Sequence, residues 1–431
     1  MKRIFFLLFL VFIGYFSPAQ NNASVNYPAD LSDSLISWRR YLHANPELGN
    51  REINTAKLVA NLLRKYGLEV REKVGYTGVV GVLKGGLPGP VIALRADMDA
   101  LPILERAPIS YASKVTAEFN GQKVGVMHAC GHDAHVSILL GTAEVLSQSK
   151  SKLAGTVVFI FQPAEEGPPN NEEGGAPLMI KEGALDNPKV EAIFGLHVNS
   201  QTPNGQIRYK SGAVMASSDW FTIKVKGKGS HGSQPWAGID PITVAAQIIN
   251  GLQTIVSRQE PLTIAPAVIS VTIVKGGVRA NIIPEEIELQ GTVRTLDAEM
   301  QKDIHQRMKI TCEKIAEASG AKAEFNIETK TLVTFNNPKL VEDFVPSLVK
   351  AAGKDNVSSS VWTTGAEDFS FFAEKVPGFF FFLGVMSPKF TPSTAFPHHT
   401  PDFEIDDSKL DVGVKAFCNI VFDYFKMFPK K

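Results

Sequence analysis

Two continuous apolar runs, each followed by acidic or histidine side chains, constrain the fold of this chain more than any other feature. Thr156–Phe161 precedes Glu165 and Glu166, and Ala192–Leu196 precedes His197. Apolar runs without polar alternation are typical of strands that are buried on both faces of a mostly parallel sheet. Because the carboxyl ends of such strands share one crevice, residues far apart in the chain can converge there. The sequence therefore predicts an α/β domain with a site at one edge of its central sheet.

Two further strands lead into polar residues in a similar way. Val91–Arg95 runs into Asp97 and Asp99, and Phe379–Leu383 is followed by the histidine pair His398–His399. Segments of helical periodicity lie between the strands, and we expect helices over residues 30–48, 54–66 and from about 132 to 147. Strands that alternate with helices predict a three-layer α/β domain with a mostly parallel central sheet.

The run Met127–His135 contains histidine, cysteine and aspartate side chains at a density that often marks metal sites. His132 and His135 are three residues apart at the expected start of a helix, so both can share one helical face. Gly131 lets the backbone turn sharply enough for Cys130 and His132 to reach one ion. The alternative is that some of these histidines only cap a helix or pack in the core.

Glu165 and Glu166 are adjacent acidic residues just after a buried strand. On extended backbone their side chains would point in opposite directions, so one could bind a metal while the other faces a bound water. A carboxylate beside a water whose pKa a metal has lowered can remove its proton. An exposed pair without function is the alternative here, and for His197 the alternative is a satisfied core histidine.

The pattern of strands changes near Ser217. Trp220–Lys226 alternates like a half-exposed antiparallel strand, and an α+β two-layer sandwich is expected from the elements that follow. These are helices over 241–259 and 297–319 and strands over 267–274, 287–294 and 323–331. Buried-strand composition returns afterwards, so this domain is expected as an insertion. The predicted boundaries are 28–216 and 332–431 for the two parts of the first domain and 217–331 for the inserted domain.

The N-terminal residues 1–20 have the layout of a secretory signal peptide. Lys2 and Arg3 are followed by the apolar run Ile4–Phe16 and then by small and turn-forming residues. The run is short for a membrane span, although an uncleaved anchor is the alternative. Three cysteines in an exported protein are too few for a disulfide framework, so we expect free thiols.

Charge and two decoy motifs narrow the function. The chain has 44 basic and 44 acidic residues without a basic stripe, which argues against a nucleic-acid partner. Gly227–Gly232 formally matches a dinucleotide-binding pattern, but Gln234–Pro235 follows instead of a helix, so we reject that function. Lys228 likewise spoils a serine-nucleophile motif at Ser230. His231 is either a polar group presented to substrate or a histidine that stabilises a turn.

Several motifs in order resemble one family over the range from about Leu31 to Asp423. The chain resembles the amidohydrolase subfamily of the clan MH metallopeptidases, which includes hippurate hydrolases, N-acyl-amino-acid amidohydrolases and plant auxin–amino-acid conjugate hydrolases. The motifs that carry the resemblance are Arg39–Gly49, Arg95–Pro102, Met127–His135, Phe161–Gly167, Gly195–His197, Gly229–Gly232, Asn281–Pro284, Gly291–Arg294 and Gly365–Phe369.

The resemblance implies a site for two divalent metal ions per subunit, Zn²⁺ or Mn²⁺. Carried over position by position, it implies the metal ligands Cys130, His132, Glu166, His197 and His399. His399 is preferred to His398 because His399–Phe403 fits the H-x-P-x-F ending of the family motif. Cysteine and histidine ligands favour zinc, whereas carboxylates keep manganese possible.

The resemblance also implies roles for four further residues. Glu165 would be the general base and Asp99 would orient the site. His231 and Asn281 would contact the substrate carboxylate or the developing oxyanion from an inserted lid and dimerisation domain.

From these observations we expect an exported enzyme, periplasmic or secreted, that cleaves the amide bond of N-acyl amino acids of hippurate-like or N-acetyl type. The first alternative is a dipeptidase or carboxypeptidase of the same fold, and the second is a non-catalytic periplasmic binding protein. The expected partners are a small N-acyl amino acid or peptide and, through the inserted domain, a second copy of the chain. No nucleic acid and no stable membrane anchor are expected.

Overall fold

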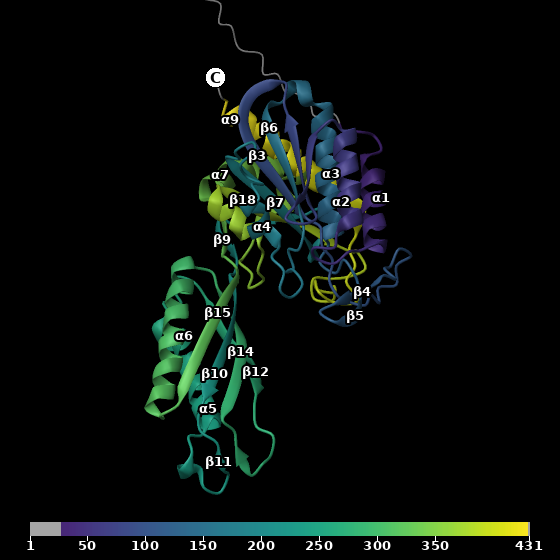
Figure 1. Cartoon of the computed structure of the whole chain (residues 1–431). Helices are drawn as coiled ribbons and strands as arrows, with labels where there is room; N and C mark the ends of the chain where they lie inside the picture. The colour runs from purple at the N-terminus through teal and green to yellow at the C-terminus, as the bar shows by residue number, and fades with distance from the viewer. Residues whose placement is uncertain (1–26, 430–431) are drawn as a thin grey trace, which may run out of the picture.

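The computed structural model describes residues 27–429, so the signal peptide expected at 1–20 lies outside the described residues. Within the described range, none of the helices combines the length and apolar character that crossing a membrane requires. The chain forms a larger domain at the top of Figure 1 and a smaller, elongated domain below it.

A sheet of eight strands organises the larger domain. Its order is β1 (Glu69–Val74), β2 (Gly78–Lys84), β6 (Ala154–Gln162), β3 (Leu87–Asp97), β7 (Ala192–Pro203), β18 (Gly378–Met386), β8 (Ile207–Tyr209) and β17 (Val357–Ser359). The central strands β6, β3, β7 and β18 run parallel to one another, whereas β1, β2 and β8 join by antiparallel pairing. The predicted mostly parallel centre of an α/β sheet is therefore confirmed.

Both faces of this sheet are covered, as the continuous apolar runs predict. In β6, Val157, Phe159 and Phe161 belong to the core on one face, and Val158 and Ile160 belong to the core on the other. Successive strand residues point to opposite faces, so only a strand covered on both sides needs an unbroken apolar run. The first face carries α1 (Leu31–Ala44), α2 (Ile53–Lys65), α3 (His132–Gln148), α7 (Pro338–Ala352) and α9 (Leu410–Met427), and the second carries α4 (Gly175–Lys181) and α8 (Phe369–Lys375).

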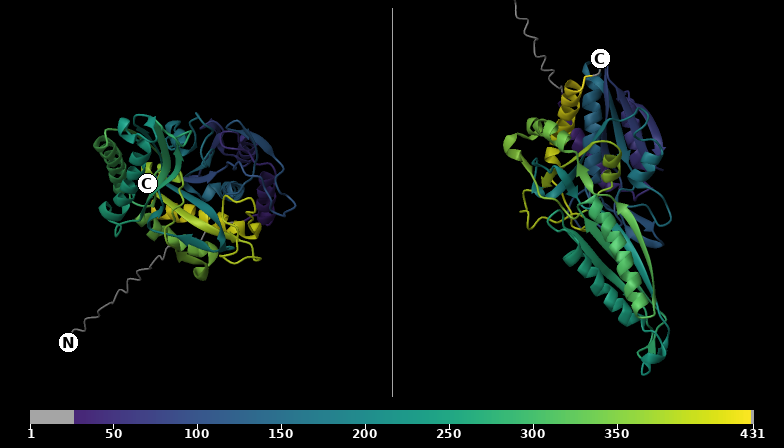
Figure 2. Two further views of the ribbon diagram at one scale, coloured as in Figure 1. Left: turned by 90° about the horizontal axis from the view of Figure 1, so that it is seen from below. Right: turned by 90° about the vertical axis from the view of Figure 1, so that its left-hand side faces the viewer.

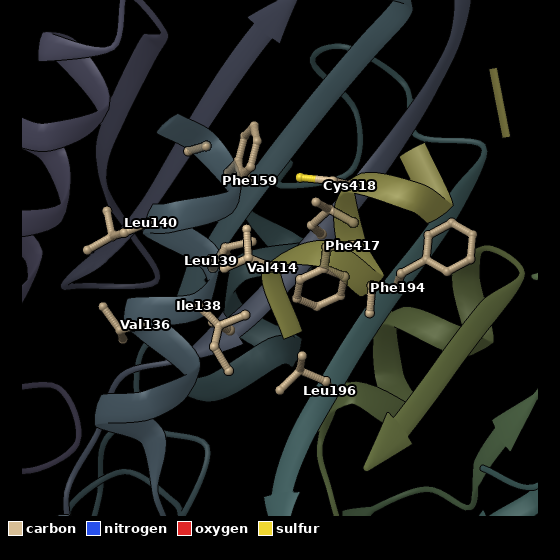
Figure 3. Close-up of a cluster of buried hydrophobic side chains, with 14 of the residues drawn as sticks. Val136, Ile138, Leu139, Leu140, Phe159, Phe194, Leu196, Val414, Phe417 and Cys418 are labelled. Atoms are coloured by element: carbon tan, nitrogen blue, oxygen red, sulfur yellow. The ribbon is translucent and has the colours of Figure 1, made fainter. Parts of the chain in front are cut away.

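The packing of α3 fixes the position of its N-terminal end, where the candidate metal ligands Cys130 and His132 lie. Figure 3 shows Ile138 and Leu139 of α3 beside Val414 and Phe417 of α9, next to Phe159 of the sheet. All five side chains are buried, and each buried side chain of this size contributes about 1.5–3 kcal/mol relative to an exposed one. The first turn of α3 is thereby held against the carboxyl ends of the central strands.

The smaller domain is an antiparallel sheet with helices on one face. Its order is β12 (Ala267–Lys275), β14 (Glu286–Thr295), β10 (Ser218–Lys226) and β15 (Lys322–Thr331). The helices α5 (Pro241–Thr254) and α6 (Ala298–Ala318) pack on it and share one apolar core with its strands. Asp240 and Asp297 cap them by accepting hydrogen bonds from first-turn amides. Figure 2 shows this domain extended away from the larger one.

Short paired strands complete the molecule. A two-stranded ribbon of β11 (Ser230–His231) and β13 (Ile282–Ile283) lies at the tip of the smaller domain, farthest from the larger sheet (Figure 1). At the junction of the domains, β9 (Gly212–Met215) pairs with β16 (Thr334–Asn336). The hairpin β4 (Thr116–Phe119) and β5 (Gln122–Gly125) lies beneath the larger domain.

One strand boundary differs from the expectation. We expected the strand that begins at Ala192 to end just before His197, but β7 continues to Pro203. His197 lies opposite Phe382 of the parallel strand β18, and the pairing extends to Pro203 opposite Met386. The prediction was wrong because polar residues after Leu196 were taken as the end of the strand, although backbone pairing with β18 continues there.

Candidate metal centre

The proposed ligands come from four separate parts of the chain and meet at the carboxyl edge of the central strands. Cys130 and His132 lie at the start of α3, and Glu166 follows β6. His197 lies within β7, and His399 lies in the segment that follows β18. Groups of side chains that could hold a metal ion include Cys130, Glu166 and His399, with ligand atoms within 4.8 Å of one another.

The thiol of Cys130 lies between two histidine rings. Its Sγ is 3.4 Å from Nε2 of His197 and 3.3 Å from Nε2 of His399. The same Nε2 of His399 is 2.9 Å from Oε1 of Glu166. Gly131 has φ +87°, and a Cβ there would lie 2.4 Å from Cγ2 of Val198. Glycine is therefore required between Cys130 and His132, as the sequence argument proposed.

Asp99 links the second half of the cluster. Its Oδ1 lies 3.1 Å from Nδ1 of His132, and its Oδ2 accepts a hydrogen bond of 2.9 Å from the backbone N–H of Glu166. The ring of His132 is fully buried, and among the described residues its Nε2 has no hydrogen-bond partner. A buried ring nitrogen without a partner is costly unless a ligand satisfies it, and a carboxylate on the other nitrogen is the usual support of a metal-binding histidine.

The backbone at the glutamate pair differs from the extended conformation that we expected. Glu165 and Glu166 lie in a turn after β6, and Ala164 before them has φ +51°. Oε1 of Glu52 holds this turn by accepting a 2.9 Å hydrogen bond from the N–H of Ala164. The two glutamates still face different groups: Glu166 faces His399, and Oε2 of Glu165 lies 3.9 Å from Nε2 of His132.

The two neighbouring histidines after β18 have different surroundings. Both ring nitrogens of His398 face backbone, Nδ1 lying 3.2 Å from the carbonyl oxygen of Cys130 and Nε2 accepting from the N–H of Ser200 at 3.3 Å. His399 has φ +62°, and its Nε2 faces Cys130 and Glu166. The geometry therefore favours His399 as the ligand, although Cys130, His197 and His398 also form a group within ligand distance.

The electrostatics of the cluster favour bound positive charge. Burial opposes the charged form of His132, but attraction to Asp97 and the hydrogen bond to Asp99 raise its pKa to about 10. Burial and the nearby Glu166 raise the pKa of the Cys130 thiol. Both raised pKa values mean that the His132 ring and the Cys130 thiol retain their protons next to the surrounding carboxylates. Divalent cations are the charges that would displace those protons, because metal ligands bind in their deprotonated forms.

Two residues at this edge have contacts that sequence reasoning did not predict. His135, in the same run as the ligands, is held by Asp97 at 2.5 Å through Nδ1 and accepts from the N–H of Val198 at 2.8 Å. Both ring nitrogens of His135 therefore have hydrogen-bond partners, and the residue supports the site. Glu52 had no role in the sequence interpretation; its only signal is an isolated acid at the start of a helix.

The inserted-domain residues are not brought to this cluster within one chain. His231 lies in β11 and Asn281 directly precedes β13, so both lie at the tip of the smaller domain, where both are exposed. The N–H of Gly232 donates to the carbonyl oxygen of Asn281 at 2.9 Å, and Oγ of Ser233 lies 2.7 Å from Nδ1 of His231. The structure thus places the two predicted substrate-binding residues close to each other, at the end of the smaller domain that points away from the predicted metal ligands (Figure 1).

Comparison with known proteins agrees with this geometry. The model of peptidase family M20/M25/M40 matches residues 93–423. This chain belongs to that family. A carboxypeptidase of Saccharolobus solfataricus, thermostable carboxypeptidase 2, is 41% identical over 393 residues, which cover 90% of this chain and 94% of the relative. N-acetylcysteine deacetylase of Bacillus subtilis is 40% identical over 387 residues, 90% of this chain and 95% of the relative.

A solved M20 structure has a similar fold over most of this chain. A Bacillus subtilis protein, described as a dinuclear metal-binding peptidase of family M20, superposes with a TM-score of 0.76 at 36% identity. The match covers 91% of this chain and 98% of that one. The resemblance to clan MH amidohydrolases is confirmed, and the chain is a metal-dependent hydrolase of the M20 family.

Proposed function

We propose that this M20 hydrolase is an exported enzyme that cleaves the amide bond of N-acyl amino acids. The observation that carries the proposal is the convergence of Cys130, His132, Glu166 and His399, with a further glutamate, Glu165, beside them. The N-acetylcysteine deacetylase relative supports the substrate class, because an N-acetyl amino acid carries both the amide and the free carboxylate that we invoke.

Each residue of the centre has a distinct task in this proposal. Cys130, His132, Glu166, His197 and His399 would hold two divalent ions, a number also supported by the dinuclear relative. Such ions polarise a carbonyl and lower the pKa of water, which is the chemistry that amide hydrolysis needs. Asp99 keeps Nδ1 of His132 engaged, so that Nε2 faces the centre.

Glu165 moves the proton in this scheme. Its carboxylate lies beside His132 and Glu166, with Oε2 3.9 Å from Nε2 of His132, so it can accept a proton from water and donate it to the leaving amine nitrogen. A base of this kind contributes about 10²–10⁴-fold in rate.

His231 and Asn281 would recognise the substrate carboxylate. Because they lie at the tip of the inserted domain, they reach a substrate only if the domain closes or if a second copy supplies its tip. An imidazole and an amide that share one ribbon are suited to bind a carboxylate or a developing oxyanion.

A carboxypeptidase activity is the second candidate, and the carboxypeptidase relative at 41% identity favours it. The two candidates share their chemistry, since a C-terminal residue and an N-acyl amino acid both place a free carboxylate one carbon from the scissile amide. They differ only in the size of the acyl side of the bond.

One assay separates these functions. Purified protein with added Zn²⁺ or Mn²⁺ is offered hippurate, N-acetyl amino acids, N-blocked dipeptides and free dipeptides, and kcat/KM is measured for each. The proposal expects the highest values for the N-acyl amino acids. Preference for N-blocked dipeptides would contradict the proposed substrate class and favour a carboxypeptidase activity. Binding without turnover, unaffected by a chelator, would indicate a binding protein instead.

Export rests on the first twenty residues. Lys2, Arg3 and the apolar run that follows have the order of a signal peptide. Fractionation of cells that produce the full chain, with N-terminal sequencing of the mature protein, tests this proposal. A cytoplasmic protein that still begins at Met1 would contradict it.

We further propose a homodimer formed through the inserted domain. β12 is an edge strand of its sheet, and Val268 and Val274 on it are exposed. An exposed apolar edge strand is a ready template for pairing with another strand. The variant Val274→Lys should shift the protein to monomer in light-scattering measurements. The matched variant Ile310→Lys, at an exposed apolar residue on α6, should leave the dimer intact.

A further inference from the structure

A second group of buried charged and polar side chains lies beside Glu165. Arg95 comes from β3 and Gln162 from the end of β6, and Glu367 and Asp368 precede α8. All four are buried in the catalytic domain. None of them belongs to the proposed ligand set, so the presence of a cation and two acids here requires an explanation of its own.

The side chain of Asp368 is held from three elements. Its Oδ1 accepts hydrogen bonds from Nη2 of Arg95 at 2.9 Å and from Nε2 of Gln162 at 2.8 Å. Its Oδ2 accepts from the same Gln162 nitrogen at 2.7 Å and from the N–H of Ala176 at 2.8 Å. Gln162 is itself fixed, because its Oε1 accepts from Nε of Arg95 at 2.8 Å. Asp368 therefore has little freedom to change its rotamer.

The backbone near Asp368 is adapted to this arrangement. Gly175, which begins α4, has φ +65°, and a Cβ there would lie 2.6 Å from Oδ2 of Asp368. Only a residue without a side chain lets the N–H of Ala176 approach the carboxylate so closely. Arg95 also contacts Oε1 of Glu367 at 2.8 Å, so that one guanidinium balances both acids.

The fixed position of Asp368 affects Glu165 through the backbone N–H of Asp368. The N–H of Asp368 points to Oε1 of Glu165 at 3.4 Å, while Oε2 of the same glutamate lies 3.9 Å from Nε2 of His132. One oxygen thus faces the fixed peptide and the other faces the metal ligands. A distance of 3.4 Å is long for an N–H···O hydrogen bond, so this contact contributes orientation more than binding energy.

We propose that Asp368, fixed by Arg95 and Gln162, is a positioning residue that aims Glu165 at the reacting water. The guanidinium also contacts Glu367 and Asp368 directly, and so neutralises part of the negative charge beside the Glu165 carboxylate. The inference rests on the proposed function, in which Glu165 carries the proton.

The first test replaces Asp368 by asparagine. The variant Asp368→Asn retains the size of the side chain but turns an N–H₂ group toward donors, so the peptide before α8 should move. Because small misplacements of a reacting group cost about 10²-fold in rate, we expect kcat to fall by that order. KM and the metal content from elemental analysis should stay at the wild-type values. A loss of metal that parallels the loss of kcat would overturn the inference in favour of a structural role.

Asp219→Asn is the matched control. Asp219 is also fully buried and also accepts from a glutamine amide, Nε2 of Gln301, at 2.9 and 3.1 Å, but it lies in the inserted domain. This variant should keep the wild-type kcat even if its melting temperature falls. A loss of kcat in the control equal to that in Asp368→Asn would show that replacing any buried aspartate by asparagine has this effect. That result would overturn the inference.

A double-variant cycle shows whether Asp368 acts through Glu165. Glu165→Gln alone and the double variant Glu165→Gln with Asp368→Asn should have the same residual kcat, because a base that has been removed cannot be misaligned. Losses that multiply would overturn the inference. If Asp368→Asn does not fold, Gln162→Leu takes its place in the cycle, since it removes both amide hydrogen bonds to Asp368 and leaves the charge pair with Arg95.

The two levels of the proposal fail in different ways. Wild-type turnover in Glu165→Gln would remove the proposed proton carrier and with it the proposed function. An inactive Glu165→Gln, combined with wild-type kcat in both Asp368→Asn and Gln162→Leu, would leave the function standing and overturn only the positioning role.

Discussion

The catalytic domain and the inserted domain treat polar side chains in opposite ways. At the edge of the catalytic sheet, groups such as Arg95, Asp97 and His132 are fully buried and contact other charged groups. At the tip of the inserted domain, His231 and Asn281 are exposed, and their hydrogen-bond partners include the nearby residues Ser233 and Gly232. The buried groups depend on one another, so a change in one affects its neighbours. The exposed groups can be changed singly, and a loss there reports on substrate alone.

The largest effect is expected for Glu165→Gln. This change removes the proton acceptor and keeps the shape of the side chain, so turnover of the best N-acyl amino acid should fall by about 10²–10⁴-fold. Metal content should not change, because Glu165 is not in the ligand set. Steady-state kinetics with elemental analysis of the same preparation measure both quantities. Turnover near that of the wild type would refute the assignment.

Cys130→Ala tests the interdependence of the buried cluster. Sγ of Cys130 lies between the rings of His197 and His399, so its loss should reduce the bound metal per subunit and lower the activity accordingly. Cys312→Ala is a suitable control, because that buried thiol lies on α6 of the inserted domain. Unchanged metal stoichiometry in Cys130→Ala would count against the ligand set.

His231→Ala and Asn281→Ala test the independence of the tip. Removing either group should lower kcat/KM by about 10–100-fold, the range of one lost hydrogen bond to a charged group. Metal content and melting temperature should equal those of the wild type, since both side chains are exposed. If these variants lost metal or stability, the contrast between the two regions would not hold.

The smallest effect concerns stability and pH at Glu52. Burial and the neighbouring Asp99 raise the pKa of Glu52 from 4.5 to about 8. The folded protein therefore binds this proton more tightly than the unfolded chain does, and the contribution to stability is full below about pH 4.5 and is lost as the pH rises to about 8. In metal-free protein, Glu52→Gln should lose less stability than the wild type between these values. Melting temperatures measured across this range test the sign, and parallel curves would contradict it.

Much of the fold could be predicted because burial leaves a local pattern. The run Thr156–Phe161 indicated a strand covered on both faces, and its residues do alternate between two cores. The alternating Trp220–Lys226 indicated a strand with one exposed face, and it lies in the inserted sheet. The strands β8 and β17, at one end of the larger sheet, are three residues each and carry no comparable pattern, so the sequence did not predict them.

For the site, the residue types were readable but their arrangement was not. The resemblance selected Glu165 and Glu166, yet the argument from extended backbone was wrong, because the backbone turns at Ala164, where Glu52 from before the distant helix α2 accepts a hydrogen bond. Arg95 and Asp368 were quoted within motifs without a role. Their contact joins positions 273 residues apart, and no local spacing reveals such a pair.

The sequence by itself determined which chemistry this protein can perform, because cysteine, histidine and paired carboxylates at strand ends are ligands and bases wherever they meet. It also predicted a sheet covered on both faces and a separate two-layer sandwich, because the period of apolar residues in a segment indicates how many of its faces are buried. Only the tertiary structure decided which nitrogen, oxygen or sulfur faces the centre. It also decided that the tip residues lie away from it. Those outcomes depend on contacts between distant segments, and their energies are not a property of any one stretch of chain.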